Sequence, residues 1–290
     1  METADRNTDM FCVPAILSCL GLPAVYVASL YVWGFPINRC TCGHYATAIK
    51  KRFISIFFVC LVSPTSLYFG MNENVFQKAT ILELLGLRWP GLIQAIVIPL
   101  LLTMILFLGP LSVMGWDGIW RLCSESMFWP GNKRTLTWWR SQVVAPLSEE
   151  WTFRACMLPV LLQCFTPITA IFVCSLIFGV AHMHHIVCRV QEGMTFKRAF
   201  LISCLHCSYT TLFGLYAAFL FVKTGHLAAP VISHSFCNCM ELPDFSTAFE
   251  DPFRRLPLYV IGLVSFCLLL TPMTKPTLFH NNLFWSKYFI

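Results

Sequence analysis

Long apolar stretches alternate with shorter polar segments along the whole chain. About eight of these stretches have the composition of membrane helices. They are Phe11–Phe35, Phe53–Gly70, Gly91–Trp116, Gln142–Cys164, Ile168–Val187, Phe200–Val222, Leu227–Met240 and Leu256–Thr274. Most reach the roughly 17–25 residues that a helix needs to cross the hydrocarbon core, whereas Leu227–Met240 is too short alone. The pattern predicts an all-α, polytopic membrane bundle of about eight transmembrane helices, forming a single domain over residues 1–290.

The composition agrees with a membrane protein and excludes an ordinary soluble domain. Hydrophobic residues make up 57% of the chain and charged residues only 12%, against about 25% charged in soluble domains. The net charge of +6 is modest, and no basic helix or aromatic–basic motif accompanies it. We therefore expect the lipid bilayer, and no nucleic acid, as a partner. The residues before the first apolar run lack the basic leader of a secretory signal, so this run is expected to stay as an anchor.

Cysteine is frequent, with 15 residues, but most of these lie inside apolar runs. Buried cysteine usually acts as a small hydrophobic residue, and we interpret most of them in that way. The motif Cys40-Thr-Cys42-Gly-His44 resembles a metal ligand set or an acylation site. It is too short to close a metal site alone, so the sequence leaves the role of Cys40 and Cys42 open.

Basic residues gather in four of the connecting segments. With eight alternating spans these segments all fall on one side, and the positive-inside rule makes that side cytosolic. The segments are Ile37–Arg52, Asp117–Ser141, Cys188–Ala199 and Asp251–Arg255. Both termini are then expected on the opposite face.

Two adjacent carboxylates and an arginine interrupt the apolar run Gln142–Cys164. Charge at membrane depth is unfavourable by a few kcal/mol per group, roughly, so it indicates function. On a helix, Glu150 and Arg154 are four residues apart and share a face, which predicts an ion pair. Glu149 lies about 100° round the helix from Glu150 and is freer to face a cavity.

Three further polar groups are expected at the same depth as Glu149. His182 lies near the cytosolic end of the fifth predicted span, and His234 and Asn238 share a helical face in the seventh. From the predicted boundaries, Glu149 and His182 each lie roughly 10–12 Å from the cytosolic surface. We expect one cavity open to the cytosol. The remaining histidines are interpreted as packing or interface residues (His206 and His226) or as solvated ones (His184 and His185).

A glutamate beside a histidine can hold and deprotonate a water molecule. A second histidine and an amide can donate hydrogen bonds to the oxyanion of a tetrahedral intermediate. Glu149, His182, His234 and Asn238 therefore suit hydrolysis of an amide by water.

Other chemistries stay open at this point. Glu149, His182 and His234 could instead ligate zinc, although no HExxH helix is present. No GxSxG motif supports a serine nucleophile, and Cys156 and Cys237 carry no nucleophile signature. A transporter or scaffold with buried charges is the alternative outside the enzymes.

The motifs resemble those of the CAAX prenyl protease 2 family, the Ras-converting type of intramembrane endopeptidase. Its EExxxR, FxxxH and HxxxN motifs are matched by Glu149–Arg154, Phe178–His182 and His234–Asn238. Each motif is short, but the three occur in order on three predicted helices. Further likeness lies in Leu101–Pro110, Phe153–Pro159, Gly179–His182, Ser208–Thr210 and Thr224–His226.

The resemblance implies a multi-pass enzyme of the endoplasmic reticulum membrane whose active site faces the cytosol. It implies removal of the last three residues from farnesylated or geranylgeranylated CAAX proteins, such as small GTPases, without a cofactor. Glu149 and His182 would activate water, and His234 and Asn238 would stabilise the oxyanion. Glu150, Arg154 and Phe178 would support them, and the catalytic spans would occupy roughly residues 142–240. The wider superfamily also includes members assigned to immunity and scaffolding.

Overall fold

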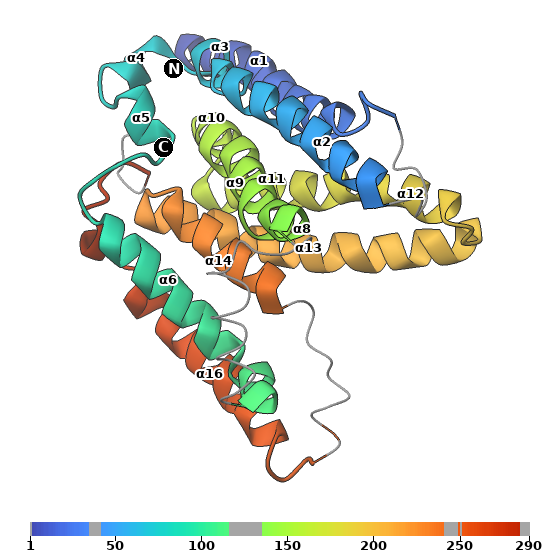
Figure 1. Ribbon diagram of the computed structural model, residues 1–290. Coiled ribbons are helices and arrows are strands. Elements are labelled where there is room, and N and C mark those ends of the chain that lie inside the picture. The colour runs from blue at the N-terminus through green and yellow to red at the C-terminus, as the bar shows by residue number, and fades with distance from the viewer. Residues whose placement is uncertain (1, 35–41, 116–134, 241–248, 250, 285–290) are drawn as a thin grey trace.

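The computed structural model describes residues 2–34, 42–115, 135–240, 249 and 251–284. Within these ranges the regular elements are all helices, and no strand occurs. Figure 1 shows long helices that cross one another at several angles, with α6 and α16 packed side by side. The predicted all-α class is confirmed. Residues 37–41 and 117–134, which belong to two of the predicted basic segments, lie outside the described residues.

Each of the eight predicted apolar segments contains helix. The longest helices are α1 (Glu2–Ser29), α2 (Cys42–Val62), α11 (Pro167–Ala181), α13 (Phe196–Thr224) and α16 (Leu256–Met273). In the described part of the chain, five helices are long and apolar enough to cross a membrane. A sixth candidate is the pair α6 (Leu92–Leu106) and Leu108–Gly115, which is bent by 74°. The sequence thus predicted a polytopic helical membrane protein correctly.

The two segments beyond those six candidates carry Glu149 and His234. The first is a helical run that changes its winding four times between Thr135 and Leu162. Its parts are α8 (Thr135–Trp139), η1 (Arg140–Val144), α9 (Ala145–Glu150), η2 (Trp151–Met157) and α10 (Leu158–Leu162). Both η1 and η2 are π-helical, a winding that is rare and often found at functional sites. The second segment is α14 (Ala228–Met240), with 13 residues.

Shorter helices complete the fold. They are α3 (Thr65–Gly70), α4 (Glu73–Phe76), α5 (Ile81–Leu84), η3 (His182–His184), α12 (His185–Gln191) and η4 (Pro276–Phe279). The first of these, α3, continues the direction of the second predicted span. The short helix η3 begins at His182, so the chain changes its winding at a predicted catalytic residue as well.

The main hydrophobic core surrounds η2 and α10. Phe153, Met157, Leu158 and Phe178 are essentially inaccessible to solvent there. The helices α11 and α13 approach closely beside this core, because Gly179 has no side chain: a Cβ atom at that position would lie 2.9 Å from the carbonyl oxygen of Cys207. This close approach fixes the end of α11 against α13, and His182 is the next residue after α11.

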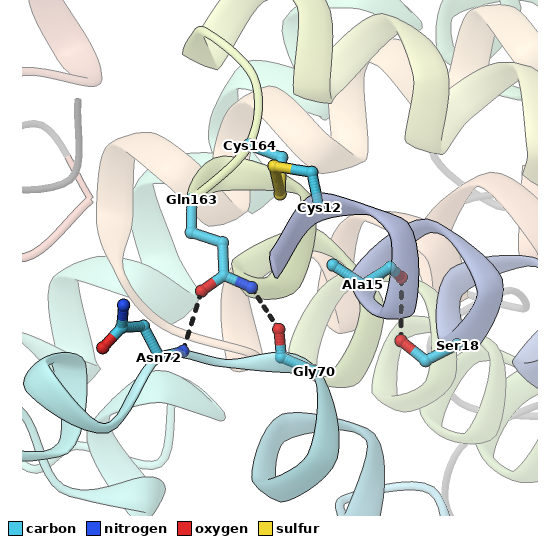
Figure 2. The surroundings of a disulfide bond; sticks show 7 residues. All are labelled: Cys12, Ala15, Ser18, Gly70, Asn72, Gln163 and Cys164. Carbon is cyan, nitrogen blue, oxygen red and sulfur yellow. Dashed lines mark hydrogen bonds between the residues drawn. A yellow bond between two sulfur atoms is a disulfide. The ribbon is translucent and has the colours of Figure 1, made fainter. Parts of the chain in front are cut away.

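A disulfide joins the first helix to the end of α10. Figure 2 shows Cys12 bonded to Cys164, across 152 residues of sequence. Next to it, Gln163 accepts a hydrogen bond from the backbone N–H of Asn72 (3.0 Å) and donates one to the carbonyl of Gly70. The sequence did not predict this pairing, since it treated most cysteines as packing residues. Cys40, and the side chains of Cys42 and His44, lie outside the described residues.

Candidate active site

Three helical regions bring the predicted catalytic residues together. Glu149 and Glu150 end α9, His182 begins η3 directly after α11, and His234 lies in the middle of α14. A single oxygen of Glu149, Oε2, lies 3.8 Å from Nε2 of His182 and 3.9 Å from Nε2 of His234. The prediction that these three side chains meet is confirmed.

Glu150 and Arg154 form the predicted ion pair. Arg154 Nη1 donates to Glu150 Oε1 over 3.1 Å, and both side chains are fully buried. The guanidinium also donates to the carbonyl of Gly214 (3.3 Å) and lies 4.2 Å from the centre of the Phe178 ring. A buried arginine needs such partners, because removing charge from water costs several kcal/mol, roughly, per ion.

Glu150 has a second partner that the sequence did not predict. Nδ1 of His234 donates to the same Glu150 Oε1 over 2.7 Å. This contact crosses from α9 to α14, so the spacing within one motif could not reveal it. Because an ionised carboxylate only accepts hydrogen bonds, Nδ1 of His234 carries a proton and Nε2 points toward Glu149.

His182 is oriented in the same manner by its own helix. Its Nδ1 donates to the carbonyl of Phe178 over 2.8 Å, four residues earlier. The Phe178 ring packs edge-on against the His182 ring, with 4.7 Å between centroids. The FxxxH spacing therefore supplies both an acceptor and a packing surface. In the neutral ring, Nε2 of His182 is then an acceptor that faces Glu149.

The two distances to Glu149 are longer than a direct hydrogen bond. Contacts of this length between polar groups suit a water molecule that touches both. The Glu149 side chain is 16% exposed, unlike that of Glu150, which is 0% exposed. Of the two adjacent carboxylates, Glu149 is therefore the one that a water or substrate can reach.

Asn238 lies one helical turn beyond His234, but its hydrogen bond goes elsewhere. Its Nδ2 donates to the carbonyl of Ser141 over 2.8 Å. Ser235 on the same helix donates to the carbonyl of Gln142 over 2.6 Å. These two bonds hold α14 against η1. An amide nitrogen carries two N–H donors, and among the described residues only the Ser141 carbonyl accepts from Asn238, so the other N–H can donate to a ligand.

The other predicted assignments divide into two groups. His226 is buried and bonds to the carbonyl of Pro90 through Nε2 (2.9 Å), as a packing residue would, and Cys156 lies within the core. In contrast, His184 and His185 are half-buried and not simply solvated. They form a ring cluster with His206, whose ring lies 5.0 Å from that of His185 and 5.4 Å from that of His182.

No metal-binding group of three His, Cys, Asp or Glu side chains is found in the part of the chain that the structure describes. The two imidazole Nε2 atoms and Glu149 Oε2 are nevertheless all possible ligand atoms by their chemistry.

Comparison with known proteins gives one consistent result. Residues 131–240 match the family model described as type II CAAX prenyl endopeptidase Rce1-like. The chain is 42% identical over 285 residues to CAAX prenyl protease 2 of Homo sapiens, covering 93% of this chain and 84% of that protein. It is 33% identical over 287 residues to CAAX prenyl protease 2 of Arabidopsis thaliana, covering 92% of each. No solved structure matches the chain.

Proposed function

Because the chain belongs to the CAAX prenyl protease 2 family, we propose that it removes the C-terminal tripeptide from farnesylated or geranylgeranylated CAAX proteins within the membrane. Family membership makes it a peptidase of the CAAX endopeptidase class. One observation carries the mechanistic part of the proposal: two imidazole Nε2 atoms face a single oxygen of the partly exposed Glu149.

The attacking water is held by Glu149 and His182. Water has two O–H donors, and these two groups offer two acceptors, the carboxylate Oε2 and the lone pair on Nε2. The hydrogen bond from His182 Nδ1 to Phe178 keeps that lone pair pointed at Glu149. Glu149 takes the proton as the water oxygen attacks the carbonyl carbon of the scissile amide.

His234 and Asn238 stabilise the oxyanion that forms. With Nδ1 committed to Glu150, His234 can donate from Nε2 only as an imidazolium. The carboxylate of Glu150 lies 2.7 Å from Nδ1, so the positive charge of the imidazolium would face a negative one. The second N–H of Asn238 supplies another donor. Collapse of the intermediate breaks the C–N bond, and Glu149 returns its proton to the leaving amine.

The substrate and the site are matched in depth. A prenyl chain lies in the hydrocarbon layer, whereas the attached peptide starts at the membrane surface. The sequence predicts that Glu149 lies roughly 12 Å from the basic face. We propose that this face is the cytosolic face of the endoplasmic reticulum membrane.

The Cys12–Cys164 disulfide supports this orientation. The alternation of spans puts both cysteines near the face opposite the basic segments, which is the lumen in our proposal. Disulfides persist in oxidising compartments such as the lumen of the endoplasmic reticulum and are rare in the cytosol. The position of the bond and the charge pattern therefore favour the same orientation.

Epitope tags in sealed microsomes test the orientation. A tag inserted at Gly193, an exposed residue between α12 and α13, should be reached by a membrane-impermeant protease. A tag inserted at Gln77, an exposed residue beyond α4, should be protected until the membrane is opened. Protection of the Gly193 tag together with cleavage of the Gln77 tag would contradict the proposed orientation.

A cleavage assay with the purified protein tests the activity and its metal dependence. A farnesylated peptide ending in Cys-a-a-X should yield the intact tripeptide and a farnesylcysteine carboxylate, whereas the same peptide without the farnesyl group should not be cleaved. Activity should persist after extensive treatment with a tight chelator, and no acyl-enzyme adduct should appear by mass spectrometry. Stoichiometric zinc, with activity lost on its removal and regained on its return, would instead make Glu149, His182 and His234 metal ligands.

A further inference from the structure

A groove beside the active site has a single charged residue in an otherwise largely apolar wall. Its volume is about 630 Å³, which lies within the usual range for small-ligand sites. It is lined by Arg189, Ile202, Leu205, His206, Ser208, Tyr209 and Leu212. All but Arg189, which belongs to α12, come from α13. Figure 1 shows these two helices as neighbours.

Arg189 is held in place but is not neutralised. Its Nη1 donates to Ser203 Oγ over 2.6 Å, and its Nη2 donates to His206 Nδ1 over 3.2 Å. Ser203 is fully buried, so it is a fixed anchor. Within the described residues, no carboxylate lies within ion-pair distance of Arg189. The guanidinium has five N–H donors, and its two bonds to described residues leave three that can donate to a ligand.

His206 adds another donor to the same groove. Because arginine only donates hydrogen bonds, Nδ1 of His206 accepts, and the neutral ring carries its proton on Nε2. The ring also stacks on Tyr209, with 4.8 Å between centroids. The groove therefore combines a cation, an N–H donor and apolar walls, a combination that suits an apolar peptide with a free carboxylate.

The distance from the catalytic residues suits a tripeptide. The His206 ring lies 5.4 Å from the His182 ring, and Arg189 contacts His206 directly. Arg189 is therefore within about 10 Å of His182, and three extended residues span about 10 Å. A scissile bond at Glu149 and a terminal carboxylate at Arg189 are thus compatible with one bound substrate.

We propose that Arg189 and His206 bind the C-terminal carboxylate of the substrate, and that the apolar wall of the groove contacts the two residues before it. The inference rests on the proposed function, since it places the tripeptide that this function removes. It explains why cleavage would release three residues. Binding of the C-terminal carboxylate fixes the position of the substrate peptide, and the bond three residues before its end then lies against Glu149.

The test compares a farnesylated peptide acid with the same peptide ending in an amide. On the unaltered enzyme, kcat/KM should fall by about ten- to a hundredfold for the amide, mainly through KM, as expected when a charge-assisted hydrogen bond is lost. Arg189→Gln should lose about the same factor on the acid and show little further loss on the amide. Arg198→Gln, which removes an exposed charge of α13 outside the groove, should behave like the unaltered enzyme.

Several results would overturn the inference. If the unaltered enzyme cleaves acid and amide equally well, no carboxylate is recognised, and this comparison needs no folded variant. If Arg189→Gln slows cleavage of both substrates equally, Arg189 has a structural role. If Arg189→Gln slows cleavage only in nanodiscs with anionic phospholipid, Arg189 binds a lipid headgroup. If the unaltered enzyme cleaves neither peptide, the proposed function fails and the inference fails with it.

Discussion

Replacing Glu149 by glutamine should reduce hydrolysis of a prenylated CAAX peptide by about a hundred- to ten-thousandfold, the usual contribution of a general base. Glutamine is nearly isosteric with glutamate, but it cannot accept the proton of the attacking water. The fold should be unaffected, because Glu149 makes no ion pair with Arg154 and its separations from both imidazoles exceed hydrogen-bond length. The measurement is single-turnover cleavage per folded molecule, with melting in detergent recorded beside it.

Glu192→Gln is the matched control for this variant. Glu192 is an exposed carboxylate at the end of α12, so its replacement should leave both cleavage and melting unchanged. Retention of activity within about threefold by Glu149→Gln would remove Glu149 from the chemical step, given the factors that general bases contribute. Glu149→Ala should give the same loss as Glu149→Gln, because the missing group is the base in each case.

The sequence predicted that the site residues meet, because the predicted depths of three side chains in the membrane agreed. Glu149, His182 and His234 were each placed at one layer by counting residues from the basic segments, and the structure brings them within 3.8–3.9 Å. The Glu150–Arg154 pair followed from the spacing on one helix. The all-α fold class could also be predicted from the sequence, because apolar segments of this length form helices in a membrane.

The features that sequence reasoning missed depend on contacts between distant segments. The bond from His234 to Glu150 joins residues 84 positions apart, and it requires a particular rotation of α14 against α9. The Cys12–Cys164 disulfide joins residues still further apart. The π-helical winding of η1 and η2 was not expected from the sequence either. In η2 nearly every residue is buried, so its apolar residues face several directions and show no periodic pattern.

The changes in helical winding lie next to the residues of the candidate active site. The π-helical η2 begins directly after Glu150 and contains Arg154, and the winding changes again at His182. Such segments alter the direction of successive side chains relative to an α-helix. This is consistent with the different surroundings of the two glutamates, one facing the imidazole Nε2 atoms and the other buried with Arg154.

Glu150→Ala should destabilise the protein by about 3–5 kcal/mol, because Arg154 would keep its burial and lose its carboxylate. Activity per folded molecule should also fall by about ten- to a hundredfold, since His234 would lose the charged acceptor at Nδ1. Glu150→Gln retains an acceptor oxygen for His234 and should therefore keep more activity per folded molecule than Glu150→Ala.

An exposed ion pair provides the control for Glu150. Asp251→Asn breaks the contact between Asp251 and Arg254, which are 3.9 Å apart and 43% and 87% exposed. Because exposed pairs contribute about 0–1 kcal/mol, melting in detergent should barely change. A Glu150→Ala protein that melts normally but is inactive, beside an active Glu149→Ala protein, would show that the two glutamates have the opposite roles. If Glu150→Ala and Asp251→Asn lose the same stability, the buried Glu150–Arg154 pair contributes no more to stability than an exposed pair.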